Sequence, residues 1–213
     1  MGNEFSSPGP IYAYKLFSRE KGKILEVGCG DLGYNFNVVT DGDYFVGLDI
    51  SDEAIKKAKK NIRHRKKPSD FIVASATDLP FKDNSFDLVS SIETLTLMGE
   101  DFYKALKEMK RVSKDKLIFT LSHVDIAKAY NPGKEHEFVN KGNYFLVNSS
   151  KSGDKVFFTK ANIETLLEKL ELRIETLDVL KNFDVIALAD YWAANYCEFP
   201  HVDSRFFIEA RKK

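Results

Sequence analysis

Short apolar runs alternate along the chain with segments in which apolar residues recur every three or four positions. A short apolar run is typical of a strand buried on both faces, whereas the longer spacing is typical of a helix that buries one face. Strands are predicted at Ile24–Val27, Tyr44–Ile50, Phe71–Ala74, the end of Asp83–Ser91, Asp115–Ser122, Leu172–Leu180 and Arg205–Ala210. Helices are predicted at Ile11–Arg19, after Gly33, after the N-cap Ser51 with a buried stripe at Ile55, Ala58 and Ile62, at Phe102–Val112, and from the N-cap Thr159 through Leu170.

This alternation predicts a doubly wound α/β fold with a mainly parallel sheet. The length of 213 residues favours one domain, residues 1–213. The connection at about residues 123–158 is long for such a fold, and long excursions in compact domains are usually functional. It contains the apolar run Tyr144–Val147 and, after a turn-like stretch, Lys155–Phe158. We therefore expect a hairpin that forms a lid.

Composition restricts the partners and the compartment. The 32 basic and 32 acidic residues cancel, so no overall charge attracts the protein to nucleic acid or to an anionic membrane. No apolar run is long enough for a membrane span and no signal-peptide core is present, although Met1–Ser6 fits the short N-myristoylation pattern. Cys29 and Cys197 lie far apart and match no metal spacing, which predicts no metal site and a reducing, cytoplasmic setting.

Three glycines, Gly28, Gly30 and Gly33, follow the first predicted strand. Glycine allows a sharp turn and lets a ligand approach the backbone, and a helix N-terminus behind it offers free N–H groups. The spacing has three interpretations: a dinucleotide fingerprint, Gly28-x-Gly30-x-x-Gly33; a turn preceded by an acid, Glu26-x-Gly28-x-Gly30; or a turn that binds no ligand. Asp49 ends the second predicted strand 19 residues after Gly30, where a carboxylate accepts hydrogen bonds from ribose hydroxyls.

A longer segment separates these interpretations. Residues 76–91, ATDLPFKDNSFDLVSS, resemble the segment between the third and fourth strands of class I S-adenosylmethionine-dependent methyltransferases of the ubiquinone-biosynthesis-like (type 11) branch. Nicotinamide dehydrogenases do not share this segment. The resemblance covers Ile24–Ser91 well and continues loosely to Ser122. It implies a Rossmann-like sheet in the order 3-2-1-4-5-7-6 with strand 7 antiparallel, and S-adenosylmethionine as cofactor, with S-adenosylhomocysteine as product.

The resemblance also implies a cofactor site where strands end, at which Gly28, Asp49, Ser75 and Ser91 should converge. Two positions depart from the family pattern: Leu32 stands where a third glycine is usual, and Ser75 stands where an aspartate usually takes the adenine amino group, with Asp78 nearby as a substitute. The implied cofactor-binding residues are Glu26, Gly28, Cys29, Gly30, Asp49, Ile50, Ser75, Ala76, Thr77 and Ser91.

The catalytic residues are harder to predict from the sequence, because the cofactor already activates the methyl group and the protein mainly positions the reactants. In-line transfer to an O, N or C nucleophile needs a general base only where that nucleophile is protonated. His123, directly after the fifth predicted strand, is the first candidate base, and Glu93, after the fourth, is the second.

The expected acceptor is a small organic molecule, enclosed by the lid and by the aromatic side chains of Tyr191, Trp192 and Tyr196. We expect a monomer or homodimer without nucleic-acid or membrane partners. Two alternatives stay open. The basic run Lys56–Lys67 would suit an RNA substrate, with a protein substrate in the same class. The departures at Leu32 and Ser75 would suit a domain that binds S-adenosylmethionine as a sensor or partner subunit without transferring a methyl group.

Overall fold

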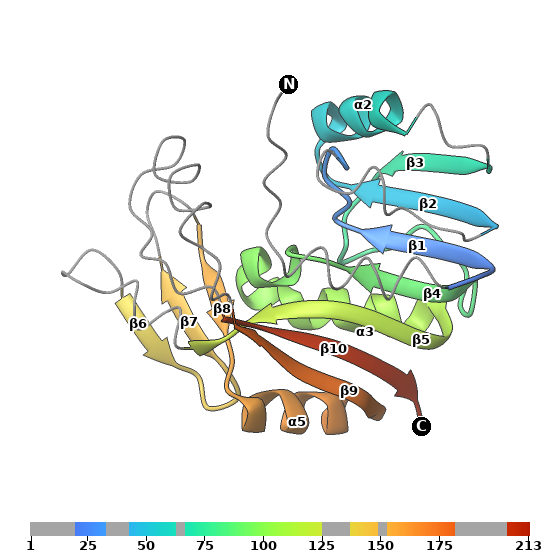
Figure 1. Cartoon of the computed structure of the whole chain (residues 1–213). Coiled ribbons are helices and arrows are strands. Elements are labelled where there is room, and N and C mark those ends of the chain that lie inside the picture. The colour runs from blue at the N-terminus through green and yellow to red at the C-terminus, as the bar shows by residue number, and fades with distance from the viewer. Residues whose placement is uncertain (1–19, 33–42, 63–66, 125–136, 149–152, 182–203) are drawn as a thin grey trace.

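A seven-stranded sheet forms the centre of the computed structural model, which describes residues 20–32, 43–62, 67–124, 137–148, 153–181 and 204–213 (Figure 1). The strand order is β3-β2-β1-β4-β5-β10-β9, which confirms the predicted order once β9 and β10 are counted as the sixth and seventh strands. β1 to β5 are parallel, and β10 is antiparallel to both of its neighbours, as expected. The strands are β1 (Lys23–Val27), β2 (Tyr44–Asp49), β3 (Ser69–Val73), β4 (Phe86–Ser91), β5 (Ser113–Ser122), β9 (Leu172–Lys181) and β10 (Ser204–Lys212).

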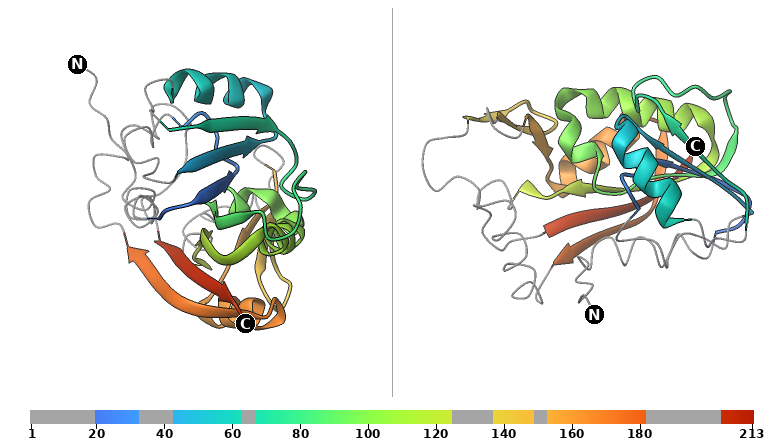
Figure 2. Two further views of the ribbon diagram at one scale, coloured as in Figure 1. Left: turned by 90° about the vertical axis from the view of Figure 1, so that its right-hand side faces the viewer. Right: turned by 90° about the horizontal axis from the view of Figure 1, so that it is seen from above.

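Helices cover both faces of this sheet (Figure 2). α2 (Asp52–Asn61) packs Ile55 and Ala58 into a core with β1, β2 and β4 side chains, and the predicted N-cap Ser51 accepts a hydrogen bond from the Ala54 N–H at 3.2 Å. α3 (Phe102–Val112) and α5 (Lys160–Lys169) share the second core cluster, which contains alternate side chains of the same strands. No helix in the described part of the chain is both long and apolar enough to cross a bilayer.

A second, three-stranded antiparallel sheet lies beyond the ends of β4 and β5 (Figure 1). It contains β6 (Glu137–Asn140), β7 (Phe145–Asn148) and β8 (Lys155–Phe157), so the predicted hairpin of β7 and β8 is present and carries an additional strand. The 3₁₀ segment η1 (Leu95–Asp101), which the sequence did not predict, packs against β8.

Aromatic contacts fix the small sheet on the domain. The Phe102 ring meets the rings of Tyr144 and Phe158 edge to face, each at a centroid distance of 5.2 Å. The Tyr144 hydroxyl donates to Glu100 in η1 at 2.7 Å. The predicted helices at Ile11–Arg19 and behind Gly33, and the predicted pocket residues Tyr191, Trp192 and Tyr196, lie outside the described residues.

Candidate functional site

The glycine turn after β1 is tied to the end of β2. The N–H groups of Gly28 and Cys29 both donate to the Leu48 carbonyl, at 2.7 and 3.0 Å. Gly28 has φ +74° and Gly30 has φ +56°, both in the left-handed region that favours glycine. The sharp turn predicted from the glycines is therefore present, and the backbone conformation favours glycine at both positions.

The surroundings of these two glycines differ. A Cβ built on Gly28 would lie 2.2 Å from Thr94 Oγ1, and this hydroxyl donates to the Gly28 carbonyl at 3.0 Å. A Cβ built on Gly30 would meet no atom of the described residues within 4 Å. Gly28 therefore accommodates the protein's own Thr94, whereas no described residue fills the side-chain space of Gly30.

Asp49 joins the glycine turn to the ends of β2 and β3. Its Oδ2 accepts from the Gly30 N–H and its Oδ1 accepts from the Ser51 N–H, each at 2.9 Å. Its carbonyl accepts from the Ala74 N–H at 3.0 Å, at the point where β3 ends. A carboxylate offers about four lone-pair sites, so Asp49 retains capacity for further donors. The next side chain, Ile50, is 77% exposed, which leaves an apolar surface beside the carboxylate.

A compact turn follows β3. Ser75 Oγ lies 2.9 Å from Thr77 Oγ1 and accepts from the Thr77 N–H at 3.2 Å, while the Ser75 carbonyl accepts from the Asp78 N–H at 3.2 Å. Ala76 is buried in the core, and Asp78 is exposed. We name residues 75–78 the β3 turn. Its hydroxyls are ordered by one another, so the position that the family fills with an aspartate carries a hydrogen-bonded serine.

Besides Ala76, three of the predicted cofactor residues have buried side chains. Ser91 Oγ donates to the Val27 carbonyl at 2.9 Å and so joins the ends of β4 and β1. Glu26 is buried at the end of β1. Burial raises the pKa of the buried Cys29 thiol well above its ordinary value, and the nearby Glu26 and Asp49 carboxylates raise it further, so the thiol stays protonated near neutrality. The side chains of Glu26, Cys29 and Ser91 are therefore buried in the protein.

A chain of contacts connects the four positions that were expected to converge. Ser91 bonds the end of β1, Gly28 follows that end and bonds β2, and Asp49 bonds both Gly30 and the residue before Ser75. The carboxyl ends of β1 to β4 therefore bring these residues to one edge of the sheet. This is the edge at which open α/β sheets bind their ligands.

The two candidate bases lie on opposite faces of β5. Glu93 has a left-handed backbone (φ +65°), its N–H donates to Thr120 Oγ1 at 2.8 Å, and its carboxylate forms an ion pair with Arg205. His123 follows β5 on the other face, since its ring packs on Phe206 at 4.9 Å. Glu93 is thus held by an ion pair, and the His123 ring packs on an aromatic ring.

Sequence reasoning missed Thr94, Thr120 and Arg205. Each acts through a partner far away in the sequence, which a local pattern does not reveal. The backbone of Leu32 is also left-handed (φ +56°), and Leu32 occupies the position at which the family pattern has its third glycine. The turn therefore holds a leucine in a left-handed conformation that favours glycine.

Comparison with known proteins agrees with this geometry. Residues 25–120 match the family model for a methyltransferase domain. An uncharacterized methyltransferase of Schizosaccharomyces pombe is 31% identical over 143 residues, which are 62% of this chain and 50% of that protein. The phthiotriol/phenolphthiotriol dimycocerosates methyltransferase of Mycobacterium tuberculosis is 40% identical over 93 residues, which are 42% of this chain and 33% of that protein. The chain thus spans half or less of the length of the curated relatives that it matches first.

The fold has a similar counterpart among solved structures. A SAM-dependent methyltransferase of Methanosarcina mazei superposes with a TM-score of 0.66, covering 95% of this chain and 97% of that chain at 22% identity. This superposition concerns the fold, whereas the family match covers β1, the glycine turn, Asp49 and the β3 turn in sequence. Residues 25–120 are therefore similar in sequence to the methyltransferase domain family, and the fold of the chain is that of solved SAM-dependent methyltransferases.

Proposed function

We propose that the protein transfers the methyl group of S-adenosylmethionine to an O, N or C nucleophile of a small organic molecule. The observation that carries the proposal is the side-chain space of Gly30, which lies beside the Asp49 carboxylate and which no described residue fills. At Gly28 the corresponding space is filled by Thr94. The left-handed Gly30 backbone instead borders space in which a ligand can touch the main chain.

The residues around that space suit the cofactor. The Asp49 carboxylate would accept hydrogen bonds from the ribose hydroxyls, the exposed Ile50 would pack on the purine, and the β3 turn would meet the adenine edge. Backbone groups of Gly28 and Gly30 would lie along the amino-acid end, and the buried Glu26 would orient the turn from below. When bound, S-adenosylmethionine supplies a methyl group already activated by the sulfonium charge.

The remaining work of the protein is to orient the acceptor, exclude water and, for a protonated nucleophile, take a proton. We assign the role of general base to His123, which lies at the end of β5. An imidazole is suited to proton transfer near neutral pH. Glu93 is the weaker candidate because its carboxylate is already paired with Arg205. The small sheet β6-β7-β8 would serve as the lid over the acceptor.

A small-molecule acceptor is favoured over RNA by the charges on α2. Lys56 and Lys57 each pair with an acidic residue one turn earlier, Asp52 and Glu53, so part of the basic face is neutralised within the helix itself. Nucleic-acid binding relies largely on lysine and arginine side chains that neutralise phosphates. α2 also lies on the flank of the sheet next to β3 (Figure 1).

Binding of S-adenosylhomocysteine, measured by calorimetry, tests the proposal. Gly30→Ala should fill the open space and reduce affinity at least about tenfold, because the new methyl group meets the ligand. Gly142→Ala is the matched control, since Gly142 also has a left-handed φ (+82°) and open space around it, but lies in the β6–β7 connection. The two variants should lose similar stability, and only Gly30→Ala should lose affinity.

Four outcomes would contradict the proposal or part of it. Binding of NAD without binding of S-adenosylmethionine would reassign the glycine turn, and equal affinity of wild type and Gly30→Ala would remove the ligand from that space. Release of S-adenosylhomocysteine with a low-molecular-mass cell extract distinguishes the enzyme from the sensor, which would bind tightly without turnover. Methyl label found in RNA, and lost when Lys59 and Lys60 are neutralised, would reassign the acceptor.

A further inference from the structure

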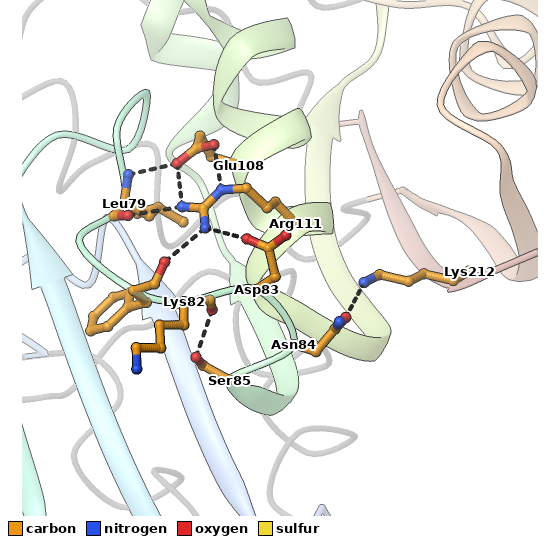
Figure 3. A network of polar contacts seen from close by, with 9 residues as sticks. Leu79, Lys82, Asp83, Asn84, Ser85, Glu108, Arg111 and Lys212 are labelled. Atoms are coloured by element: carbon orange, nitrogen blue, oxygen red, sulfur yellow. Dashed lines mark hydrogen bonds and ion pairs between the residues drawn. The ribbon is translucent and has the colours of Figure 1, made fainter.

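A network of polar contacts joins the loop after the β3 turn to helix α3 (Figure 3). The bonded residues of the loop and the helix are about 30 positions apart in the sequence. Arg111, in the last turn of α3, points toward the loop that runs from Leu79 to Ser85. Its guanidinium donates to the carbonyls of Leu79 and Phe81 at 2.9 and 2.7 Å, and to Asp83 Oδ1 at 2.8 Å. The rigid fork of an arginine can reach several acceptors at once, which a lysine cannot.

Glu108, one helical turn earlier, completes the network. Its two carboxylate oxygens accept from Arg111 Nε and a terminal guanidinium nitrogen at 2.8 and 2.7 Å. One of the same oxygens accepts from the Leu79 N–H at 2.8 Å. Both backbone polar groups of Leu79 are therefore held by the Arg111–Glu108 pair. The Leu79 side chain is itself buried, so both the backbone and the side chain of this residue are held in place.

The other end of the β3 turn is fixed by Asp49. The Ala74 N–H donates to the Asp49 carbonyl directly before the turn, and Leu79 follows directly after it. The four residues of the turn thus span two anchored points, with their conformation set by the Ser75–Thr77 contact between them. A loop this short has little freedom once both ends are fixed.

The pair is partly shielded and stays charged near neutral pH. The side chains of Arg111 and Glu108 are 31% and 19% exposed. The Arg111 guanidinium lowers the pKa of Glu108, and the carboxylates of Glu108 and Asp83 raise the pKa of Arg111. Hydrogen bonds between charged partners are stronger than those between neutral ones, so the network is well suited to hold a loop in one place.

We propose that Arg111 is a positioning residue for the adenine end of the cofactor. It lies behind the β3 turn and acts by keeping that turn in the conformation that receives the purine edge. This inference rests on the proposed function, since it takes the β3 turn as the adenine-recognising segment. Arg111 then controls both the affinity for the adenosine group and the discrimination between purines, although it does not contact the ligand.

The experiment compares two ligands, S-adenosylhomocysteine and S-inosylhomocysteine, which differ only at the purine edge. Calorimetry gives the ratio of their dissociation constants for each variant. Wild type should prefer the adenosyl ligand about tenfold or more, because a site arranged for an amino group leaves its acceptor unpaired with an oxo group. Arg111→Ala should weaken S-adenosylhomocysteine binding about tenfold and bring the ratio close to one, because the turn is no longer preorganised.

The matched control is Lys110→Ala. Lys110 is the neighbouring residue of α3 and forms its own ion pair, with Glu171 at 3.0 Å, away from the β3 turn. The control should keep both the affinity and the ratio. Arg111→Lys is a milder variant for the case that Arg111→Ala does not fold, and it should lower the ratio because an ammonium group cannot bridge Leu79, Phe81 and Glu108 together.

The outcomes separate the two proposals. Wild type that fails to bind S-adenosylhomocysteine would refute the proposed function. Wild type that binds both ligands equally, or a folded Arg111 variant that keeps the wild-type ratio, would refute the positioning role alone. A uniform loss of both affinities with an unchanged ratio would likewise refute it, because general destabilisation has no reason to favour one purine.

Discussion

Leu32 provides a direct test of how the glycine turn is stabilised. Its backbone lies in the left-handed region (φ +56°), while its side chain is 2% exposed in the core cluster that contains Ile55 and Leu88. The family pattern would place glycine here. Replacement of Leu32 by glycine therefore removes a strained conformation and a buried side chain at the same time, and the two effects have opposite signs.

Magnitudes decide the net result. A non-glycine residue in the left-handed region costs about 1–2 kcal/mol, which Leu32→Gly would recover, less the added flexibility of the unfolded chain. Loss of a buried leucine side chain costs about 2–5 kcal/mol. We expect Leu32→Gly to lower the free energy of unfolding by roughly 2–3 kcal/mol. Leu32→Ala loses nearly the same packing and keeps the strain, so it should be less stable than Leu32→Gly by about 1 kcal/mol.

Urea unfolding of wild type, Leu32→Gly and Leu32→Ala measures this order, provided that the m value is unchanged. Leu88, in the same cluster but in strand β4, supplies the control. Leu88→Ala should be more stable than Leu88→Gly, because glycine weakens a strand. Stability of Leu32→Gly equal to or above that of wild type would show that strain outweighs packing. Leu32→Ala more stable than Leu32→Gly would show that the left-handed backbone carries no cost.

Two further predictions concern single hydrogen bonds. Thr94→Val keeps the shape of the side chain but removes its hydrogen bond to the Gly28 carbonyl, so it should lower the free energy of unfolding by about 0.5–1.5 kcal/mol in urea titrations. Thr94→Ser keeps the hydroxyl and should retain most of the wild-type stability. Burial, with a smaller contribution from Glu100, raises the pKa of Tyr144 to about 12. The stability that this gives is complete below pH 10 and is lost as the pH rises toward 12, so wild type should lose more stability than Tyr144→Phe between pH 9 and 11 in thermal unfolding scans.

The sheet could be predicted from the sequence because its strands are apolar runs separated by clear helix signals, such as the Ser51 cap. The missed elements lack such signals. β6 is four residues long with polar residues at both ends, and η1 contains a left-handed Gly99 that interrupts any helical period. β6 pairs with β7 and η1 packs against β8, so both segments depend on contacts with other parts of the chain.

The position of the site followed from the sequence for a related reason, since parallel strands must present their carboxyl ends together. The direction of individual side chains did not follow. Ser91, Cys29 and Glu26 stand at strand ends, yet their side chains turn into the protein. The Glu93–Arg205 ion pair joins β4 to β10 and depends on sheet order as well as on strand identity.

The site is built largely from backbone segments without regular structure, and partly buried polar side chains supply the hydrogen-bond partners that such segments lack. Thr94 bonds the Gly28 carbonyl, Asp49 bonds the Gly30 N–H, and Arg111 with Glu108 bonds both polar groups of Leu79. A backbone group left without a partner in such a place costs free energy comparable to a lost hydrogen bond. Substitution of any of these side chains should therefore lower stability together with cofactor affinity. Gly30 differs because nothing in the described protein fills its side-chain space, so its replacement should separate affinity from stability beyond the backbone strain that Gly142→Ala shares.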